Sequence, residues 1–403
     1  MIVIDIRISS VRLVRLSGVL PEPSDTRPPA LQSRPVSIYG HLHDGDVGHP
    51  TNLVDPRAKS SLYLEIGTTA GVVGRYGPID REAIGPLGEE GMAQQLLGLD
   101  PMAGTMIWDV LQRADRHSRH GARKIAISAI DNALWDVRGR VLGAPVWQLL
   151  GGSGRAEIPA YASTLGTHHD HGEIEEVAAQ LVDEGFAAQK WFFAHGPGQG
   201  QEGLARNVEL AARAREGAGP RTALMFDAFM SWDLAHATAW CREAEPFQPA
   251  WLEEPFAPAA VASYAQLRGL TRIPLAGGEH LYDRFELLPF LQQGLLAVLQ
   301  VDPEWCGGVT DLVRMCALAE PFGVPVIPHG HGLHSALHVV ASQSPSVCPR
   351  MEYLFRHMPE RHHFEIDPPA PKGGSFALPT AAGFGIELAE DRIHASMDVV
   401  AVG

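Results

Sequence analysis

Hydrophobic and polar residues follow two different rhythms along this chain. Residues 1–19 alternate between the two kinds, and residues from about 61 to 75 are also strand-like. Residues 85–120 carry apolar residues at helical spacing, and the helical stretch after them closes on Gly151-Gly152, which predicts a helix stop. The first part of the chain is therefore predicted to combine strands and helices in one α+β unit.

From residue 153 onward, short apolar runs alternate with amphipathic segments of helical length. Repeated strand–helix units are typical of a parallel sheet. Eight of them over about 200 residues predict a closed (β/α)₈ barrel. The eight runs are EIPAYASTLG, AAQKWFFAHG, RTALMFDAF, PAWLEEPF, IPLAGGEHL, LAVLQVDPEW, PVIPHGHG and PRMEYLF.

All but the first of these runs end in a residue whose side chain could take part in catalysis or metal binding. From the third run to the eighth, the gaps between these residues are 26, 26, 23, 27 and 23 positions, close to the length of one strand–helix unit. One such residue per strand at a similar height would converge on the barrel mouth, the C-terminal ends of the strands, where barrel enzymes build their sites. The residues are Lys190, Asp227, Glu253, Glu279, Asp302, His329 and Glu352.

Three of these residues are carboxylates on adjacent strands. Without a cation, Asp227, Glu253 and Glu279 would repel one another and raise one another's pKa values. With a divalent cation they become ligands, and a site made only of oxygen donors favours Mg²⁺ over zinc. The spacing therefore predicts a magnesium site.

Two further residues form a candidate acid–base pair. Asp302 and His329 lie at neighbouring strand ends, where a carboxylate on one imidazole nitrogen fixes the tautomer and raises the basicity of the other nitrogen. This arrangement predicts a general base that faces the metal. Lys190 would supply a positive charge on the second strand, opposite that base.

Composition and charge narrow the class of protein. The chain has 403 residues, of which 45% are hydrophobic, and a formal net charge of −15, which argues against nucleic acid or anionic membrane as partners. No apolar run approaches the roughly 20 residues of a membrane span, and the N-terminus lacks the pattern of a signal peptide. Four cysteines lie far apart without a CxxC pair, so we expect reduced thiols and a cytoplasmic protein.

Several of these segments resemble a known family. MFDAF, WLEEPF, AGGEHL, QVDPEWCGGVTDL, VPVIPHG and MEYL are similar to the mandelate racemase subgroup of the enolase superfamily. Within it they resemble acid-sugar dehydratases of the L-rhamnonate dehydratase kind. The resemblance covers about residues 120–355 and GFGIEL near the end, and it is weaker over the Pro-, Gly-, His- and Asp-rich segment 20–58.

The resemblance implies a fold and a division of the chain. It implies an enolase-like modified TIM barrel over residues 126–365, capped by an α+β domain over residues 1–125 that carries a lid loop at 20–58. A C-terminal segment, 366–403, would pack back on the capping domain and complete it. Family habit also implies a homo-oligomer.

It further implies roles for single residues. The metal ligands would be Asp227, Glu253 and Glu279, with Glu254 behind them. His329 and Asp302 would form the catalytic dyad, and Glu352 would be an acid that contacts the enolate. His280 would touch substrate or fill the mouth. Arg57 and Lys59, around the end of the lid, would contact hydroxyls or the carboxylate of the substrate.

Two departures from the family pattern point to a reaction. Racemases of this subgroup place a second base in a K-x-K pattern, but this chain has Lys190-Trp191-Phe192. Galactonate-type relatives carry a histidine two residues after the third-strand aspartate, where this chain has Phe229. With one base, the prediction is Mg²⁺-dependent dehydration of a sugar acid through an enediolate to a 2-keto-3-deoxy sugar acid.

Other functions stay open at this point. An epimerase or racemase of a carboxylate substrate would need a second base, which the lid could supply. A non-catalytic scaffold would need a vestigial site. A metal-dependent hydrolase could use zinc on His329 and His331, but such pairs normally lie on the first strand, which here reads AYAST.

Overall fold

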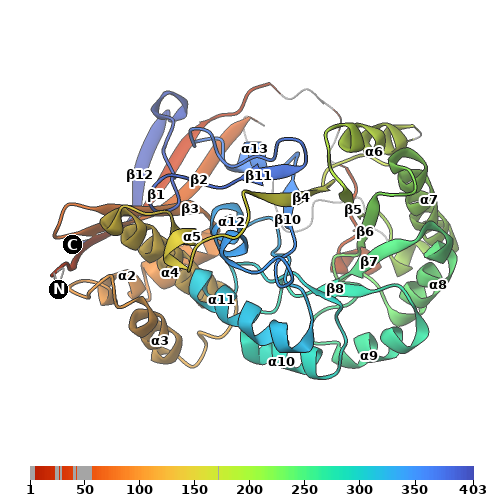
Figure 1. Cartoon of the computed structure of the whole chain (residues 1–403), viewed down its shortest axis with the longest axis horizontal. Helices are drawn as coiled ribbons and strands as arrows, with labels where there is room; N and C mark the ends of the chain where they lie inside the picture. The colour runs from red at the N-terminus through yellow and green to blue at the C-terminus, as the bar shows by residue number, and fades with distance from the viewer. Residues whose placement is uncertain (1–4, 23–26, 28–29, 40–41, 43–56, 171) are drawn as a thin grey trace.

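The structure is a computed structural model of the chain, and it describes residues 5–22, 27, 30–39, 42, 57–170 and 172–403. Much of the predicted lid at 20–58 lies outside the described residues. Figure 1 shows a smaller part with β1, β2, β3 and β12, the cap, beside a larger part in which helices surround a curled sheet.

The cap is built on a four-stranded antiparallel sheet. Its order is β12-β1-β2-β3, formed by Ala395–Val402, Ile8–Val19, Ala58–Thr68 and Val73–Ile79. The single strand expected around 61–75 is therefore wrong, because the chain turns back between Thr68 and Val73. Gly71 occupies this turn with φ 75°, a left-handed conformation that suits glycine.

The helices of the cap cover one face of this sheet. They are α1 (Ile84–Leu87), α2 (Met92–Gln95), α3 (Gly104–Ala114), α4 (Gly121–Leu142) and α5 (Val146–Leu149). The continuous helix expected over 85–120 is thus broken into pieces. A glycine lets α4 approach β3 closely, since a Cβ on Gly74 would lie 2.7 Å from the Ala133 carbonyl oxygen.

The long helix α4 ends earlier than its sequence pattern predicted. It stops at Leu142, where Gly143 takes a left-handed φ of 65°, and not at Gly151-Gly152. Pro145 follows two residues later and cannot continue a helix. The predicted division of the chain at residues 125/126 falls inside α4 and stays a prediction.

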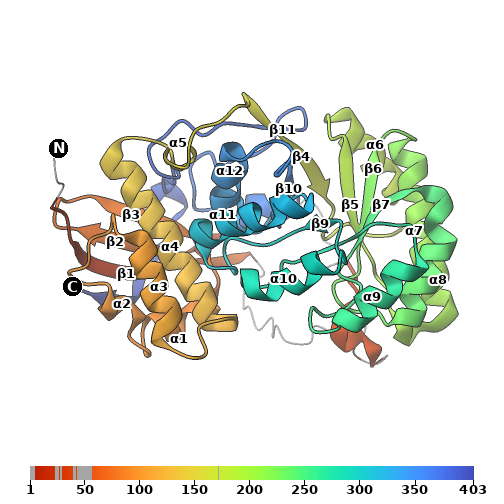
Figure 2. The same cartoon turned by 60° about the horizontal axis from the view of Figure 1, so that its bottom comes forward.

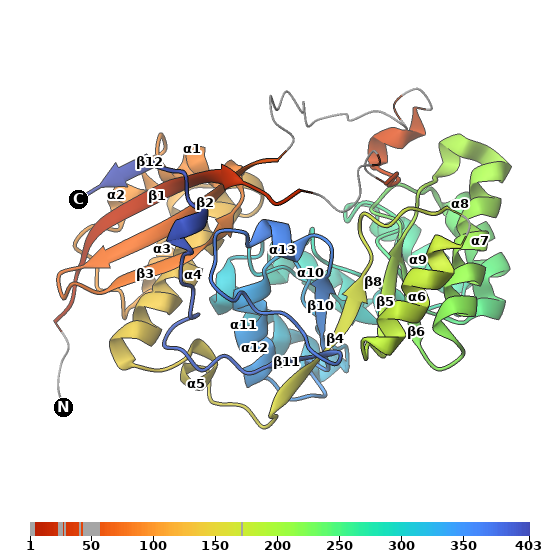
Figure 3. The same cartoon turned by 90° about the horizontal axis from the view of Figure 1, so that it is seen from above.

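The C-terminal segment contacts both parts of the protein. β12 pairs with β1 along Val11–Ser17, which adds the last strand to the edge of the cap sheet. β11 (Ser375–Ala377) pairs with the first barrel strand, β4 (Glu157–Ser163). Figure 3 shows β12 lying along β1 at one side of the cap.

The larger part is a (β/α)₈-type barrel with a parallel sheet in the order β10-β4-β5-β6-β7-β8-β9. In Figure 2, helices α6, α7 and α8 lie outside strands β5 to β7. After β4, the strands are β5 (Ala188–Phe192), β6 (Ala223–Asp227), β7 (Pro249–Glu253), β8 (Leu275–Gly277), β9 (Val298–Leu299) and β10 (Met351–Leu354). The helices are α6 (Glu173–Asp183), α7 (Gly200–Ala218), α8 (Leu234–Ala244), α9 (Val261–Leu270), α10 (Arg284–Gln292), α11 (Gly308–Ala319), α12 (Leu333–Ser342) and α13 (Met358–Arg361).

One of the eight predicted strands is reduced to a single bridge. The run PVIPHGHG pairs with β9 only through Leu299 and Val326. Its two prolines, Pro325 and Pro328, have no N–H group to donate to a neighbouring strand. The segment is still held beside β9, because the Ile327 N–H donates to the Leu299 carbonyl at 2.8 Å.

A layer of buried side chains fills the barrel interior. Because side chains alternate along a strand, the residue two positions further on points to the same interior at the next level. The steps from Ala188 to Lys190, Met225 to Asp227 and Trp251 to Glu253 follow this rule. The buried layer consists of Tyr161, Ala188, Met225, Trp251, Ala276, Val298 and Ile327.

A buried histidine joins barrel and cap and should make stability depend on pH. His338 of α12 accepts a hydrogen bond at Nδ1 from the Trp147 N–H of α5 at 3.1 Å. Burial, with His334 nearby, lowers the pKa of His338 to about 3. The neutral form is therefore required in the fold, and its contribution is lost as pH falls below about 6.5, the unfolded value.

We expect His338→Gln to flatten this dependence, since the amide can accept the same bond without titrating. Between pH 7 and pH 5 the free energy of unfolding should fall by about 2 kcal/mol less in the variant than in the parent. Urea unfolding at both pH values measures it. Equal losses in the two proteins would show that His338 does not titrate on unfolding.

Candidate functional site

The barrel mouth has a buried ammonium group at its centre. Lys190 Nζ lies 2.5 Å from Glu253 Oε1, 2.8 Å from Glu352 Oε1 and 3.2 Å from Asp227 Oδ2. These four side chains are almost completely buried. Four of the residues that the sequence pattern selected therefore meet at one point, from β5, β6, β7 and β10.

One cation among three buried carboxylates leaves an excess of negative charge. Burial opposes ionisation and raises the pKa of Glu253 well above its usual range, and it also raises that of Asp227, although Lys190 works against both shifts. Burial also opposes ionisation of Glu352, but Lys190 and His329 outweigh it and lower the pKa of Glu352 to about 2. Glu352 is thus favoured as the carboxylate partner of Lys190, and its contact with the enolate stays a prediction.

Glu253 and Glu254 are neighbours in sequence, but their carboxylates contact different side chains. Glu253 points into the barrel, where its Oε2 accepts a hydrogen bond from Trp251 Nε1 at 2.9 Å. Glu254 takes a left-handed φ of 35°, and its Oε2 lies 2.8 Å from His280 Nδ1. The left-handed backbone at Glu254, directly after β7 ends, therefore directs the two adjacent carboxylates to different partners.

Glu279 follows β8 and lies between two imidazoles. Its Oε1 is 3.6 Å from His280 Nδ1, and its Oε2 is 3.6 Å from His329 Nε2. Burial, together with Glu254 and Asp227, raises the pKa of Glu279 to about 7 against the opposing effect of the histidines. Glu279 is thus brought to the same mouth as Asp227 and Glu253, although its direct contacts are with His280 and His329.

The donor set of the mouth fits a hard divalent cation. Asp227, Glu253 and Glu279 supply carboxylate oxygens from three successive strands, and Glu254 adds another close by. Ligand atoms of Glu254, Glu279 and His280 lie within 4.8 Å of one another. Burial and mutual repulsion both raise the pKa values of these acids, and a bound cation would favour their ionised forms.

The two residues predicted to form an acid–base pair are in contact. His329 Nδ1 lies 2.8 Å from Asp302 Oδ2, and Asp302 Oδ1 accepts the Glu304 N–H at 2.6 Å. The His329 ring and the Glu304 N–H thus each contact one oxygen of Asp302. The other ring nitrogen of His329, Nε2, faces Glu279. Burial opposes the charged imidazole, but Glu279, the Asp302 hydrogen bond and Glu352 raise the pKa of His329 to about 10.

Trp305 covers this pair and was not singled out by the sequence pattern. Its ring centroid lies 5.3 Å from that of His329 and 5.7 Å from that of His280. Its Nε1 donates to Asp80 Oδ2 at 2.7 Å, and Asp80 belongs to the cap, directly after β3. The only sequence signal was its place three residues after Asp302. A cap residue thus positions the aromatic ring that packs on the dyad histidine.

His331 does not share the partner of His329. The two rings are 6.0 Å apart and nearly parallel, but His331 Nδ1 lies 2.9 Å from Glu304 Oε2, while His329 faces Asp302. Glu304 Oε2 also accepts from Arg361 Nη2 at 2.6 Å. The H-x-H pair therefore does not converge on one point as a zinc-binding pair would.

His280 also packs on Trp305, with the ring centroids 5.7 Å apart. Burial lowers the pKa of an imidazole, but the hydrogen bond and charge of Glu254, with Glu279, raise that of His280 to about 9. Glu254 and Glu279 thus favour the charged form of His280. Its contact with substrate stays a prediction.

The two residues predicted near the end of the lid lie on the cap. Lys59, on β2, lines a hollow of about 700 Å³ together with Asp80 and Arg361, which connects it to the network around His331. Arg57, one residue before β2, has its Nη1 3.9 Å from Glu22 Oε1. Their roles as substrate contacts stay predictions.

Replacement of Lys190 tests whether its ammonium group stabilises the three buried carboxylates around it. We expect Lys190→Met to lower the free energy of unfolding by about 3–5 kcal/mol, because three buried carboxylates lose their shared cation. Lys124→Met is the matched control, since Lys124 is equally buried but hydrogen-bonds an amide, Gln112 Oε1, at 2.9 Å. Chemical unfolding without added metal measures both. A Lys190→Met cost no larger than that of Lys124→Met would contradict this account.

Within the part of the chain that the structure describes, no helix is long and apolar enough to cross a bilayer. The chain matches two family profiles, one for the enolase C-terminal domain-like family over residues 173–392 and one for the mandelate racemase / muconate lactonizing enzyme N-terminal domain over residues 54–151. Between them the profiles span the cap strands β2 and β3, the cap helices and most of the barrel.

Named relatives agree with these profiles. L-rhamnonate dehydratase of Saccharopolyspora erythraea is 35% identical over 332 residues, 80% of this chain and 78% of the relative. D-galactarolactone cycloisomerase of Agrobacterium fabrum is 30% identical over 354 residues, 83% of this chain and 90% of the relative. The crystal structure of L-rhamnonate dehydratase from Gibberella zeae superposes with a TM-score of 0.81 at 26% identity, covering 97% of this chain and 96% of that one. The chain therefore belongs to the mandelate racemase and muconate lactonizing enzyme family of the enolase superfamily.

Proposed function

We propose that this protein is a hydro-lyase that dehydrates a sugar acid, an aldonate like L-rhamnonate, to a 2-keto-3-deoxy sugar acid with Mg²⁺ as cofactor. The observation that carries the proposal is the single dyad base, His329 with Asp302, that faces a buried group of carboxylates. The names of the relatives support the reaction class, and one solved relative, rhamnonate dehydratase of Gibberella zeae at 25% identity, was crystallised with Mg.

The metal would be held by Asp227, Glu253 and Glu279. When bound, Mg²⁺ supplies Lewis acidity that stabilises the negative charge an enediolate gathers on its oxygens. Lys190 adds a positive charge on the second strand, and Glu352 keeps that ammonium in place. Such preorganised charges are usually the largest contribution to catalysis of this kind.

His329 carries both proton transfers in this proposal. Its Nε2 takes the proton from the carbon next to the substrate carboxylate, while Asp302 holds Nδ1–H and stabilises the imidazolium. The imidazolium then returns the proton to the departing β-hydroxyl, which leaves as water. The enol that remains becomes the 2-keto group, so the enzyme ends in its starting protonation state.

The structure favours one base over two. Phe192 and Phe229 occupy the positions where related enzymes carry a second base, and Phe192 packs with its ring 5.2 Å from Lys190 Nζ. His280, the other imidazole beside Glu279, lies outside both of these positions. With phenylalanine at both, a racemase or epimerase has weaker support than a dehydratase.

A screen of sugar acids tests the proposed function directly. We expect 2-keto acid formation from at least one aldonate, lost after chelation and restored by Mg²⁺ better than by Zn²⁺. Glu253→Gln should be almost inactive because it removes one ligand charge. Detection of keto acids by semicarbazide, with mass spectrometry of products, measures the reaction. Full activity in metal-stripped protein, or a lactone isomer as the only product, would reject the proposal.

Exchange of the substrate α-proton tests the single base. In D₂O we expect wild-type protein to exchange the α-proton of one epimer only, and His329→Asn to abolish exchange and dehydration together. Proton NMR of recovered substrate measures it. Similar exchange rates for both epimers would reveal a second base and favour epimerisation.

The pH dependence of kcat/KM tests the dyad. The neutral imidazole is the base, so the rate should fall on the acid side of the His329 pKa. Glu279 and the Asp302 hydrogen bond raise that pKa against the effect of burial, and a cation held by Glu279 would lower it. Asp302→Asn removes a charge that favours the imidazolium. We therefore expect the acid limb to move to lower pH and the rate to fall by about 10²–10⁴-fold. An unmoved limb with a nearly unchanged rate would show that the two residues do not act as a pair.

A further inference from the structure

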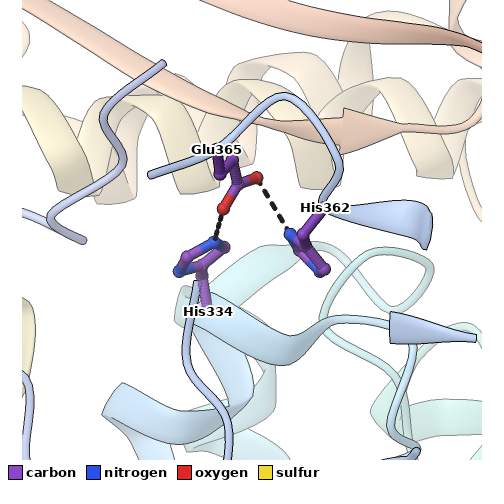
Figure 4. A group of neighbouring side chains, drawn as sticks. All are labelled: His334, His362 and Glu365. Atoms are coloured by element: carbon purple, nitrogen blue, oxygen red, sulfur yellow. Dashed lines mark hydrogen bonds and ion pairs between the residues drawn. The ribbon is translucent and has the colours of Figure 1, made fainter. Parts of the chain in front are cut away.

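A second cluster of metal-ligating side chains lies away from the barrel mouth. Glu365 stands between two histidines, with His334 Nε2 2.7 Å from its Oε2 and His362 Nδ1 2.9 Å from its Oε1. Figure 4 shows both imidazoles pointing at the one carboxylate. None of these residues takes part in the mechanism proposed above.

The cluster joins three separate segments of the chain. His334 is on barrel helix α12, and His362 and Glu365 follow α13 at a spacing of three residues. Tyr63, on cap strand β2, donates its hydroxyl to Glu365 Oε1 at 3.0 Å. All four side chains are buried, with 3% or less of their surface exposed.

The donor set suits zinc better than magnesium. The candidate ligand atoms are two imidazole nitrogens and one carboxylate oxygen, all within 4.8 Å of one another. Zinc takes such N/O sets in tetrahedral geometry, with bonds of about 2.0–2.2 Å that put neighbouring ligand atoms roughly 3.3 Å apart. The imidazole nitrogens of His334 and His362 now lie 2.7 and 2.9 Å from the Glu365 oxygens. Each nitrogen–oxygen distance would therefore have to lengthen by about 0.4–0.6 Å to reach the spacing of zinc ligands.

A further observation is the space beside the cluster. His334, His362 and Glu365 all line a hollow of about 790 Å³, which has room for water as a fourth ligand. The three protein ligands and one water would complete the tetrahedral set that zinc takes.

We propose that His334, His362 and Glu365 bind one Zn²⁺ as a structural site distinct from the proposed magnesium site. The ion would tie barrel helix α12 to the segment that leads to β11 and β12, beside Tyr63 of the cap. Two other groups of this kind, around Glu304 and around Glu279, include half-buried members and belong to the barrel mouth.

Zinc retention by the full-length protein tests the proposal without any activity measurement. Protein stripped with chelator is given Zn²⁺ in the presence of excess Mg²⁺, desalted, and analysed for metal. We expect one equivalent of zinc in the parent and in Glu253→Gln, which alters only the barrel mouth. We expect none in His362→Gln or Glu365→Gln, and a Tm that rises with zinc concentration only where zinc is retained.

Anomalous diffraction at the zinc edge decides the case if those variants fold poorly. A peak between His334, His362 and Glu365 in the parent protein supports the proposal. It is overturned if the parent retains no zinc, if both variants retain as much as the parent, or if the peak lies at the barrel mouth. Failure here leaves the proposed dehydratase function unaffected, since that function does not depend on this cluster.

Discussion

The candidate site depends on the alternation of side-chain direction along each β-strand, in which every second residue points into the barrel. Ala188, Met225 and Trp251 fill the barrel interior. Two residues further along the same strands, Lys190, Asp227 and Glu253 point into the barrel mouth. A slip of one residue on any strand would turn its functional side chain toward the outer helices. The close-packed layer beneath the mouth therefore sets the height and direction of the groups above it.

Because these side chains meet at the barrel mouth, several charged groups are buried close together. Lys190 neutralises part of the negative charge, and Trp251 adds a hydrogen bond to Glu253. Burial, with Glu254 and Asp227 nearby, still raises the pKa of Glu279 to about 7. A divalent cation held by these acids would offset their mutual repulsion.

The cap contributes to the mouth through directed contacts. Asp80 accepts from Trp305, whose ring packs on His329, and Tyr76 donates to Glu304 at 3.2 Å. Strand β12, from the end of the chain, completes the sheet that carries these residues. The geometry of the dyad thus depends on Asp80 and Tyr76, cap residues that lie more than 200 positions before it in sequence.

The amino-acid sequence by itself determined the barrel and the positions of its strand-end residues, because strand–helix periodicity is local and its repeat length shows in the spacing. It also determined that Asp302 and His329 would be neighbours. Two predictions from the sequence were wrong. The chain turns back at Gly71 where one continuous strand was predicted, and helix α4 ends before Gly143 where a longer helix was predicted. The sequence could not show that Trp305 packs on His329 or that His334 meets Glu365. Only tertiary structure decided those contacts, because they join side chains whose distance is set by the packing of whole elements and not by the spacing of residues along the chain.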